Sequence, residues 1–302
     1  MRGFNLDQLQ AFADVVDLGS FSAAAARQNL SQPAISQQVK LLETRLGVRL
    51  IERIGKRAMP TPAGQALRAH IGPIDRAIRN ALDAVAPFGN GVKGQVRVGC
   101  GATACIYFLP AVLAGIQRDY PDLDISVKTG NTGDMIRLIE NNELDIGFVT
   151  LPLASRALEI TPVMKDPFLA IFAADHSVQG PVSPDEMAEM PLVLFEQGSN
   201  TRTLVDAWLR KAGRRVHPVM ELGSVEAIKE LVGAGLGASI LPSMAVIDGR
   251  SNLPVRGRPL EPAMGRDLAI VMRRDKTLTQ GLRVVRDGII AAANSDLGQN
   301  NP

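Results

Sequence analysis

Residues 21–50 read FSAAAARQNLSQPAISQQVKLLETRLGVRL, and their pattern indicates the architecture of the N-terminal part of the chain. Its second half has apolar residues at spacings of four, three and four, which predict a helix with one buried stripe: Ile35, Val39, Leu42 and Leu46. The other face carries hydrogen-bonding side chains and no catalytic group: Gln32, Ser36, Gln37 and Lys40. Amides, a hydroxyl and an ammonium on one helix face suit base edges and phosphates, so this helix is predicted to bind DNA.

The residues before this helix predict two further helices. An apolar stripe runs from Leu6 to Val16 and ends at Gly19. Ser20 or Ser22 is placed to cap the next helix, and Ser31 to cap the third, with Pro33 in its first turn where a missing N–H costs little. The pattern is therefore a helix-turn-helix with an extra helix in front.

A basic segment follows the third helix. Five cations lie within thirteen residues: Arg45, Arg49, Arg53, Lys56 and Arg57. Gly55 offers a turn, and Pro60 and Pro62 exclude a helix. We predict a basic β-hairpin, a wing, that contacts phosphates or the neighbouring groove. The alternative, that these cations form a solvated face of an ordinary loop, is less favoured because the segment follows a helix-turn-helix.

From Thr61 the chain is predicted to be helical again. Apolar residues alternate spacings of four and three along this helix: Leu67, Ile71, Ile74, Ile78, Ala81 and Val85. Such a heptad seam needs a partner helix, most simply from a second copy of the chain, although packing on the protein's own C-terminal part is also compatible with it. Pro73 removes one backbone hydrogen bond inside the helix.

Bulk composition agrees with a basic N-terminal part. Residues 1–90 hold 11 Lys/Arg against 7 Asp/Glu, and the remainder holds 22 against 24. A 302-residue chain with 46% hydrophobic residues is long enough for two or three folded domains. There is no disulfide framework, no signal peptide and no stretch long enough to span a membrane, so we expect a cytoplasmic protein.

The last two hundred residues alternate strand and helix patterns after a predicted hinge at residues 90–94. We expect strands near 95–99, 124–128 and 144–149, with helices near 107–119 and 134–141, in an α/β domain with a mostly parallel sheet. A second series runs from about residue 165 to 266, with strands at 192–195, 216–221 and 238–241 and helices at 201–212 and 225–233. A strand at 268–272 and a helix at 278–293 are expected to return to the first lobe.

The predicted strand ends and helix starts are polar and uncharged. We expect these to bind a small carboxylate or other small anion through backbone N–H groups and hydroxyls: Ala102, Thr103, Thr129, Asn131, Thr132, Thr150, Ser199, Thr201 and Ser224. The alternative is that Thr103, Thr132, Thr201 and Ser224 are only N-caps. The lack of an evident cationic anchor argues against a strongly charged ligand, although Arg202 could supply one.

Other chemistries are weakly supported. Residues 99–104 match a dinucleotide fingerprint, but the following strand ends in Lys128 and Thr129 instead of an acid. Cys100 and Cys105 leave a redox-sensing regulator open, although small buried cysteines are common and no cation adjoins either thiol. The three histidines have no metal spacing, and no arrangement of nucleophile, base or paired carboxylates indicates an enzyme. We therefore expect no cofactor other than a small-molecule effector.

The chain resembles the LysR-type family of bacterial transcription regulators. The resemblance lies in residues 9–12 (LQAF), 19–25 (GSFSAAA), 30–36 (LSQPAIS), 38–43 (QVKLLE), 46–47, 50–53 (LIER) and 61–64 (TPAG), and it continues through the C-terminal part. Two positions depart from the family pattern. Pro60 stands where Leu is usual, and Gln37 stands where some members have Arg, which leaves the base preference open.

The resemblance implies a winged helix-turn-helix (residues 1–61), a long dimerising linker helix (62–89) and a two-lobed α/β effector domain like a periplasmic binding protein (90–302). Lobe I would comprise about 94–164 and 268–302, and lobe II about 165–267. The partners would be double-stranded promoter DNA, a small-molecule effector and RNA polymerase, with a homodimer or a homotetramer as a dimer of dimers. The implied DNA contacts are Ser31, Gln32, Pro33, Ser36, Gln37, Lys40, Arg53 and Arg57, with Arg53 at the minor groove and Lys40 and Arg57 on phosphates. A solute-binding module whose helix-turn-helix serves only dimerisation remains the alternative.

Overall fold

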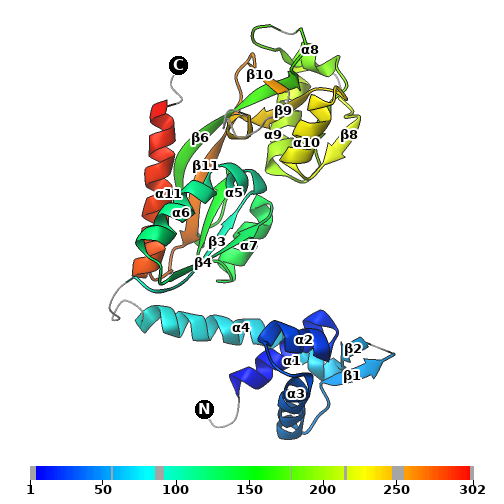
Figure 1. Cartoon of the computed structure of the whole chain (residues 1–302), viewed down its shortest axis with the longest axis vertical. Coiled ribbons are helices and arrows are strands. Elements are labelled where there is room, and N and C mark those ends of the chain that lie inside the picture. The colour runs from blue at the N-terminus through cyan, green and yellow to red at the C-terminus, as the bar shows by residue number, and fades with distance from the viewer. Residues whose placement is uncertain are drawn as a thin grey trace. The chain divides into compact units, whose positions relative to one another are not determined.

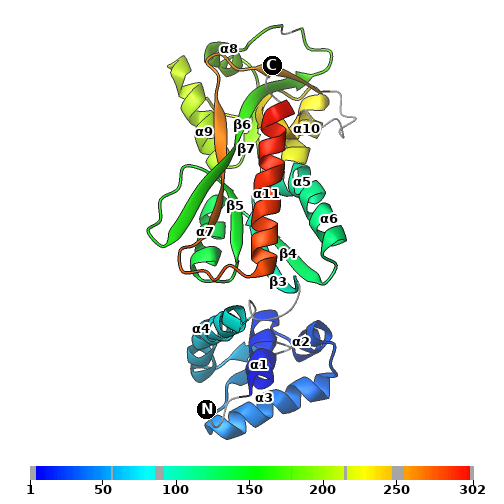
Figure 2. The ribbon, with the colours of Figure 1, turned by 90° about the vertical axis from the view of Figure 1, so that its left-hand side faces the viewer.

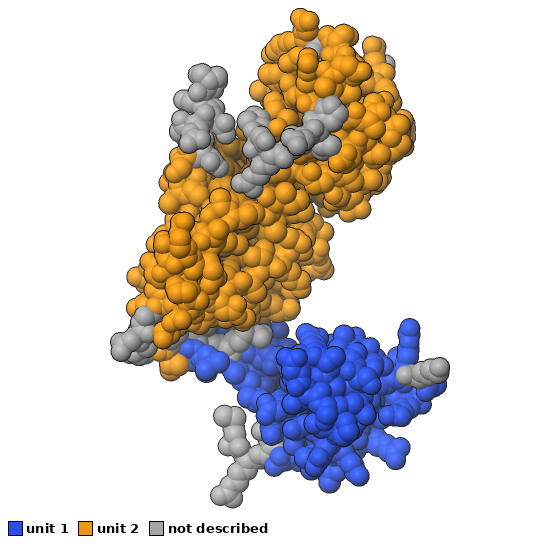
Figure 3. Space-filling model, in the orientation of Figure 1, with its two compact units in different colours: residues 1–82 blue, residues 83–302 orange. Residues whose placement is uncertain are grey.

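The computed structural model describes residues 5–55, 57–85, 92–177, 179–213, 216–246 and 255–299. The chain divides into an N-terminal unit, Met1–Leu82, and a C-terminal unit, Asp83–Pro302 (Figure 3). Residues 90 and 91 of the predicted hinge at 90–94 lie outside the described residues, as does Lys56 of the wing, and Gly94 already begins strand β3.

The N-terminal unit is a winged helix-turn-helix (Figure 1). Its elements are α1 (Leu6–Leu18), α2 (Phe21–Gln28), α3 (Gln32–Leu46), β1 (Ile51–Ile54), β2 (Arg57–Pro60) and α4 (Pro62–Val85). Gly19 ends α1 in the left-handed region, and the Ser20 and Ser31 side chains accept the N–H groups of Ala23 and Ala34, as the capping pattern predicts. Strands β1 and β2 pair antiparallel as the predicted hairpin.

The predicted seam of α4 is partly used inside its own unit. Ile71 is only 3% exposed and packs with Leu67 and Ile74 on the core formed by α1, α2 and α3. Further along the helix, the seam residue Val85 and the adjacent Leu82, which is not part of the predicted seam, are each 61% exposed. The first half of the seam therefore holds α4 to the winged helix-turn-helix, and only the second half is left for another partner.

The C-terminal unit has two lobes joined by long strands (Figure 2). Lobe I contains β3 (Gly94–Cys100), α5 (Ala102–Tyr107), α6 (Leu109–Asp119), β4 (Leu123–Thr129), α7 (Thr132–Glu140), β5 (Ile146–Thr150) and α11 (Gln280–Gln299). Lobe II contains α8 (Pro184–Ala188), β7 (Val193–Phe195), α9 (Asn200–Leu209), β8 (Met220–Leu222), α10 (Val225–Gly233), β9 (Ser239–Pro242) and β10 (Val255–Pro259), with short 3-10 turns at Arg210–Ala212 and Ser243–Ala245. Strands β6 (Leu158–Ala173) and β11 (Gly265–Arg273) take part in both lobes.

The three strands predicted first in lobe I do pair in parallel, but the sheet as a whole is mixed and not mostly parallel. The main sheet has the order β10-β6-β11-β5-β3-β4, with β9 also paired to β6. Only the β3–β4 and β3–β5 pairings between its described strands are parallel, and the other four are antiparallel. Two of these four arise because β11 returns from lobe II between β5 and β6 and runs opposite to both, and the other two are the pairings of β6 with β9 and β10.

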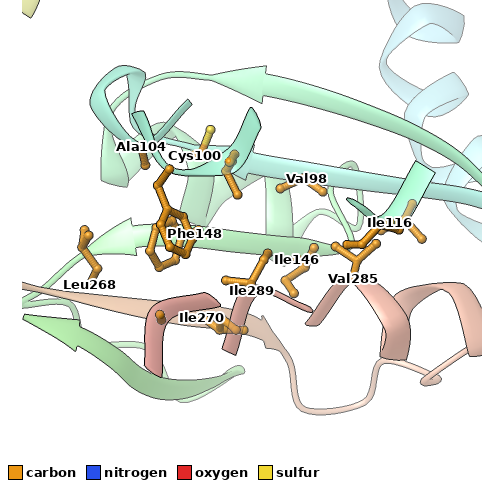
Figure 4. Close-up of a cluster of buried hydrophobic side chains, with 14 of the residues drawn as sticks. Val98, Cys100, Ala104, Ile116, Ile146, Phe148, Leu268, Ile270, Val285 and Ile289 are labelled. Atoms are coloured by element: carbon orange, nitrogen blue, oxygen red, sulfur yellow. The ribbon is translucent and has the colours of Figure 1, made fainter. Parts of the chain in front are cut away.

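The lobe I core fixes the strand ends on which the predicted site depends. Val285 and Ile289 of α11 pack with Ile146 and Phe148 of β5, beneath Cys100 at the end of β3 (Figure 4). The C-terminal helix therefore returns to lobe I, as the sequence pattern predicts. Lobe II has its own cores, one of them built around the fully buried Trp208.

Candidate DNA interface and effector site

Helix α3 presents the predicted polar face. Ile35, Val39 and Leu42 are buried, whereas Pro33, Gln37 and Lys40 are exposed and Gln32 and Ser36 are half-buried. The Gln32 amide donates a hydrogen bond to the Ser36 hydroxyl over 2.9 Å. Ser31 has a structural role as well, because its side chain caps the helix. The predicted side chains thus share one accessible surface within the first three turns of α3.

The wing brings its arginines to the same surface. A hollow of about 540 Å³ between α3 and β1 is lined by Ser36 and Lys40 of the helix and by Arg49 and Arg53. A second hollow of about 400 Å³ is lined by Gln32, Arg53 and Arg57. Arg53 lines both hollows, so the cations of the wing and the polar face of α3 form one continuous candidate interface.

Glu43 ties the wing to the helix. Its Oε1 atom accepts the N–H groups of Leu50 at 2.7 Å and Ile51 at 3.1 Å. Thr61 fastens the other end of the hairpin by donating to the Arg49 carbonyl over 2.8 Å. In the sequence Glu43 is only an acid among basic residues, and nothing in the pattern indicates its position at the base of the wing. Phe21, which lines both hollows, was missed for the same reason.

In lobe I, the predicted effector residues lie at one edge of the sheet. The parallel strands β3, β4 and β5 end there at Cys100, Thr129 and Thr150, and the Gly130 N–H donates to the Cys100 carbonyl. Ala102 and Thr103 follow at the start of α5, and Asn131 and Thr132 at the start of α7. Carboxyl ends of parallel strands with helix starts beside them are where small ligands bind in α/β sheets.

The threonines of this cluster are not N-caps, contrary to the alternative raised by the sequence. The caps are Gly101, Asn131 and Ser199, which precede Thr103, Thr132 and Thr201 by one or two residues. Only Ser224 caps its helix, by accepting the Ala227 N–H. The hydroxyls of Thr103, Thr132 and Thr201 are therefore not consumed by the ends of their helices. Thr129 and Ser224 are exposed.

The two lobes meet at the Thr150 carbonyl. It accepts hydrogen bonds from the Thr132 hydroxyl at 3.3 Å in lobe I and from the Asn200 amide at 3.2 Å in lobe II. This contact brings the N-terminus of α9, with Ser199 and Thr201, to the edge of lobe I. Ser224 takes no part in this contact between the lobes, since its described hydrogen bond lies at the start of α10.

Arg202 is not the cationic anchor that the sequence suggested. Its guanidinium donates to Asp206 at 2.8 Å, to Glu221 at 2.7 Å and to the Phe195 carbonyl at 2.6 Å. The cation that reaches the cluster is Arg266 of β11, whose Nη1 lies 3.4 Å from the Thr201 hydroxyl. Arg266 is buried and paired with the buried Asp166 of β6. It therefore offers N–H donors to the cluster, while its positive charge is already compensated by Asp166.

Cys100 is a poor redox centre. It is fully buried in the lobe I core, and burial, together with the neighbouring Cys105, raises the pKa of its thiol to about 12. Because the thiolate is the reactive form, this environment disfavours oxidation. Across the described residues no group of three His, Cys, Asp or Glu side chains could hold a metal ion. Nor is any helix within them long and apolar enough to cross a membrane.

Comparisons with known proteins match both units. Residues 6–65 match the family model described as bacterial regulatory helix-turn-helix protein, lysR family, and residues 89–293 match the LysR substrate binding domain. The HTH-type transcriptional regulator YeiE of Escherichia coli (strain K12) is 36% identical over 80% of this chain and 82% of its own length. The HTH-type transcriptional activator CmpR of Synechocystis sp. (strain ATCC 27184 / PCC 6803 / Kazusa) is 31% identical over 86% and 88%.

Solved structures show the same fold. Full-length CbnR in complex with its target DNA superposes with a TM-score of 0.72 at 21% identity, covering 96% of this chain and 100% of that one. A full-length OxyR variant from Pseudomonas aeruginosa gives a TM-score of 0.68 at 24% identity, covering 96% and 95%. At these identities the likeness concerns the fold alone.

Proposed function

Because the chain belongs to the LysR family of transcription regulators, we propose that it controls promoters by reading DNA with α3 and the wing, under the control of a small anion bound in the C-terminal unit. The observation that carries the DNA part is the shared lining of the two hollows by α3 and the arginines of β1 and β2. Gln32, Pro33, Ser36 and Gln37 approach base edges in this proposal, and Lys40, Arg53 and Arg57 neutralise phosphates or enter the minor groove.

DNase footprinting on the DNA upstream of the protein's own gene tests this assignment. Wild-type protein should protect a two-fold site, and Ser36→Ala/Gln37→Ala should lose site preference with the fold intact, since each good base contact is worth roughly 1–3 kcal/mol. Arg53→Ala should weaken binding and lower the salt slope by about one. Arg118→Ala, an exposed cation of α6, is the matched control and should change neither. Unchanged selectivity in the double variant would show that α3 is not the recognition helix.

For the effector we propose a small carboxylate or other small anion bound between the lobes. Support comes from Thr103, Thr132 and Thr201, whose hydroxyls are not used as caps, from the helix N-termini beside them and from the Thr132–Thr150–Asn200 contact. The other residues proposed to surround it are Ala102, through its backbone N–H, and Thr129, Asn131, Thr150, Ser199 and Ser224. Burial of Arg266 against Asp166 favours an anion of low charge over a polyanion.

Calorimetric titration of the full chain with small carboxylates and inorganic anions tests the effector site. Thr132→Val and Thr201→Val should each weaken the binding of an active compound about tenfold or more, because a hydrogen bond to a charged group is worth roughly 1.5–3 kcal/mol. Thr203→Val, an exposed threonine of α9 that donates to the Ser199 carbonyl, should bind normally. Equal losses of affinity in all three variants would show that the anion binds elsewhere. A compound that binds should also alter the footprint.

We further propose a domain plan of residues 1–61, 62–89 and 90–302, and a homodimer joined through the second half of α4. Exposed Leu82 and Val85 support that dimer surface. Assembly into a dimer of dimers and contact with RNA polymerase belong to the same proposal. Salt-dependent DNA binding would exclude the alternative of a solute-binding module.

A further inference from the structure

An aromatic ring lies against the arginine shared by the two hollows of the DNA interface. Phe21 is the first residue of α2, and its side chain is half-buried, with one part packed on the core of the N-terminal unit. The Arg53 guanidinium carbon is 5.8 Å from the centre of the Phe21 ring. Phe21 and Arg53 line both hollows together. We propose that Phe21 is a positioning residue, which holds the Arg53 guanidinium between α3 and the wing in the orientation that meets DNA.

Arg53 needs such a contact because nothing else in its described surroundings orients it. It lies on a strand of four residues and is exposed. Within the described ranges Arg53 makes no ion pair, whereas Arg68, Arg97 and Arg202 of the same chain are each held by carboxylates. The negative face of an aromatic ring attracts a guanidinium at this distance. Pre-orientation of a long side chain lowers the entropy lost when it binds, which is how a residue that does not touch DNA can tighten binding.

Arg57 provides the internal comparison. It is exposed and lies on the other strand of the wing, where it pairs with Ile54. It lines only the second hollow, and the described aromatic contacts include Arg53 but not Arg57. Removing the Phe21 ring should therefore weaken the DNA contact made by Arg53 and leave the DNA contact made by Arg57 unchanged.

A double-mutant cycle on the full-length protein tests this difference between Arg53 and Arg57. The role inferred for Phe21 rests on the proposed reading of DNA by Arg53. The probe is the duplex upstream of the protein's own gene, with the dissociation constant measured by fluorescence anisotropy at fixed salt. Phe21→Leu should weaken binding about two- to fivefold, the size that one exposed cation–π contact supports. Phe21→Trp should bind at least as tightly as wild type. In an Arg53→Ala background Phe21→Leu should cost nothing more, whereas in an Arg57→Ala background it should cost the full factor.

Three results would overturn the inference, and they separate it from the proposed function. If Phe21→Leu costs the same factor with and without Arg53, the ring serves packing alone. If Arg53→Ala weakens binding but Phe21→Leu does not, DNA reading by Arg53 stands and positioning by Phe21 fails. If Arg53→Ala has no effect, the proposed role of Arg53 fails first. Melting temperatures of all variants monitor folding, and if Phe21→Leu melts early, Phe21→Trp decides: looser binding by a stable Trp variant contradicts the inference.

Discussion

Asp145 carries its charge inside lobe I, between two cations. Its carboxylate is 5% exposed and accepts the Arg97 backbone N–H at 2.7 Å and the Arg97 side chain at 2.9 and 2.5 Å, with the Lys276 ammonium at 2.7 Å. Burial alone would raise the pKa of Asp145, but hydrogen bonds and charge from Arg97 and Lys276 outweigh it and hold the pKa below its ordinary value. This acid is therefore ionised in the folded chain and stabilises it.

We predict that Asp145→Asn destabilises the C-terminal unit by roughly 3–5 kcal/mol at neutral pH, because two half-buried cations lose the buried counter-charge between them. A depressed pKa gives stability that is fully present above the unfolded value, about 3.9, and is lost as the pH falls through the folded value. The wild-type advantage should accordingly shrink below about pH 4. Fluorescence of Trp208, the chain's only tryptophan, during unfolding from pH 3 to 8 measures this. A constant difference across that range would contradict the assignment.

At single positions the sequence predicts residue type better than residue role. Ser20 and Ser31 cap helices as expected from local pattern. The pattern also leaves Thr103 and Thr201 open as caps, yet the preceding Gly101 and Ser199 take that place. A cap depends on where a helix begins to within one residue, and a sequence does not define a helix start that sharply.

Among the elements, α4 begins with a close approach to the wing. A Cβ atom on Gly64 would lie 2.1 Å from the Leu50 carbonyl oxygen, whereas one on Gly115 of α6 would meet nothing closer than the end of the Arg118 side chain at 3.9 Å. We predict that Gly64→Ala costs about 1–3 kcal/mol or more by forcing the backbone apart. Gly115→Ala should instead stabilise its helix by about 0.5–1 kcal/mol. Calorimetry of both variants compares them, and a neutral Gly64→Ala would rule out the close contact.

The anchor between α3 and the wing gives a second prediction at this scale. Glu43→Ala removes the acceptor for two N–H groups, one of them on the buried Leu50, and should cost about 1–3 kcal/mol of stability. Glu43→Gln keeps an oxygen at that place and should recover much of the loss. DNA binding should follow the same order if Glu43 sets the wing's direction. Equal stability of the Ala and Gln variants would show that the two hydrogen bonds contribute little.

Elements with strong local signals were predicted closely, and those shaped by tertiary structure were not. Helix α10 spans the predicted Val225–Gly233 because Ser224 caps it and its apolar residues keep helical spacing. Strand β6 was largely missed: Pro162 and Pro167 interrupt its pattern. It extends over sixteen residues because β11 pairs with its first part and β9 and β10 with its second. The helix expected near 107–119 begins after a break at Phe108, with α5 before it. Strand β8 spans Met220–Leu222, so it shares only its first two residues with the predicted 216–221.

At the scale of the whole C-terminal unit, Lys229 joins the lobes. It lies on α10 with 1% exposure, and its ammonium is 3.0 Å from the Tyr107 hydroxyl and 5.0 Å from the centre of that ring. Tyr107 ends α5 of lobe I and packs against a lobe II core. The sequence assigns a lysine in an amphipathic helix to the solvent face, and a partner 122 residues away leaves no local signal.

We predict that Tyr107→Phe destabilises the unit by about 1–3 kcal/mol, because a buried ammonium loses a hydrogen-bond partner. Lys229→Met combined with Tyr107→Phe should be more stable than Tyr107→Phe alone, since the double change removes a buried ammonium that would otherwise keep only the half-exposed Glu226 carboxylate, 3.6 Å away. Urea unfolding followed by Trp208 fluorescence compares the three proteins. A double variant that is less stable than Tyr107→Phe would show that the ammonium has other compensation.

For the assembled protein, the second half of α4 is the surface on which the proposed dimer depends. Ile78, Leu82 and Val85 follow one another at spacings of four and three and so share a face, and the last two are each 61% exposed. Leu82→Glu/Val85→Glu places two charges on that face and should convert a dimer into a monomer. Ala66→Glu/Ala69→Glu adds the same charge at two exposed positions of α4 that do not neighbour the seam, and should leave the dimer intact.

Light scattering during size exclusion, over a range of concentrations, measures the masses of these variants. A monomer holds one recognition helix and can occupy only one half-site, so it loses the gain in effective concentration that a linked second half-site provides. DNA affinity of Leu82→Glu/Val85→Glu should therefore fall by a hundredfold or more, by order of magnitude, while its salt slope falls by about half because half the phosphate contacts are lost. A monomeric wild type, or equal dissociation by Ala66→Glu/Ala69→Glu, would place the dimer interface away from this face of α4.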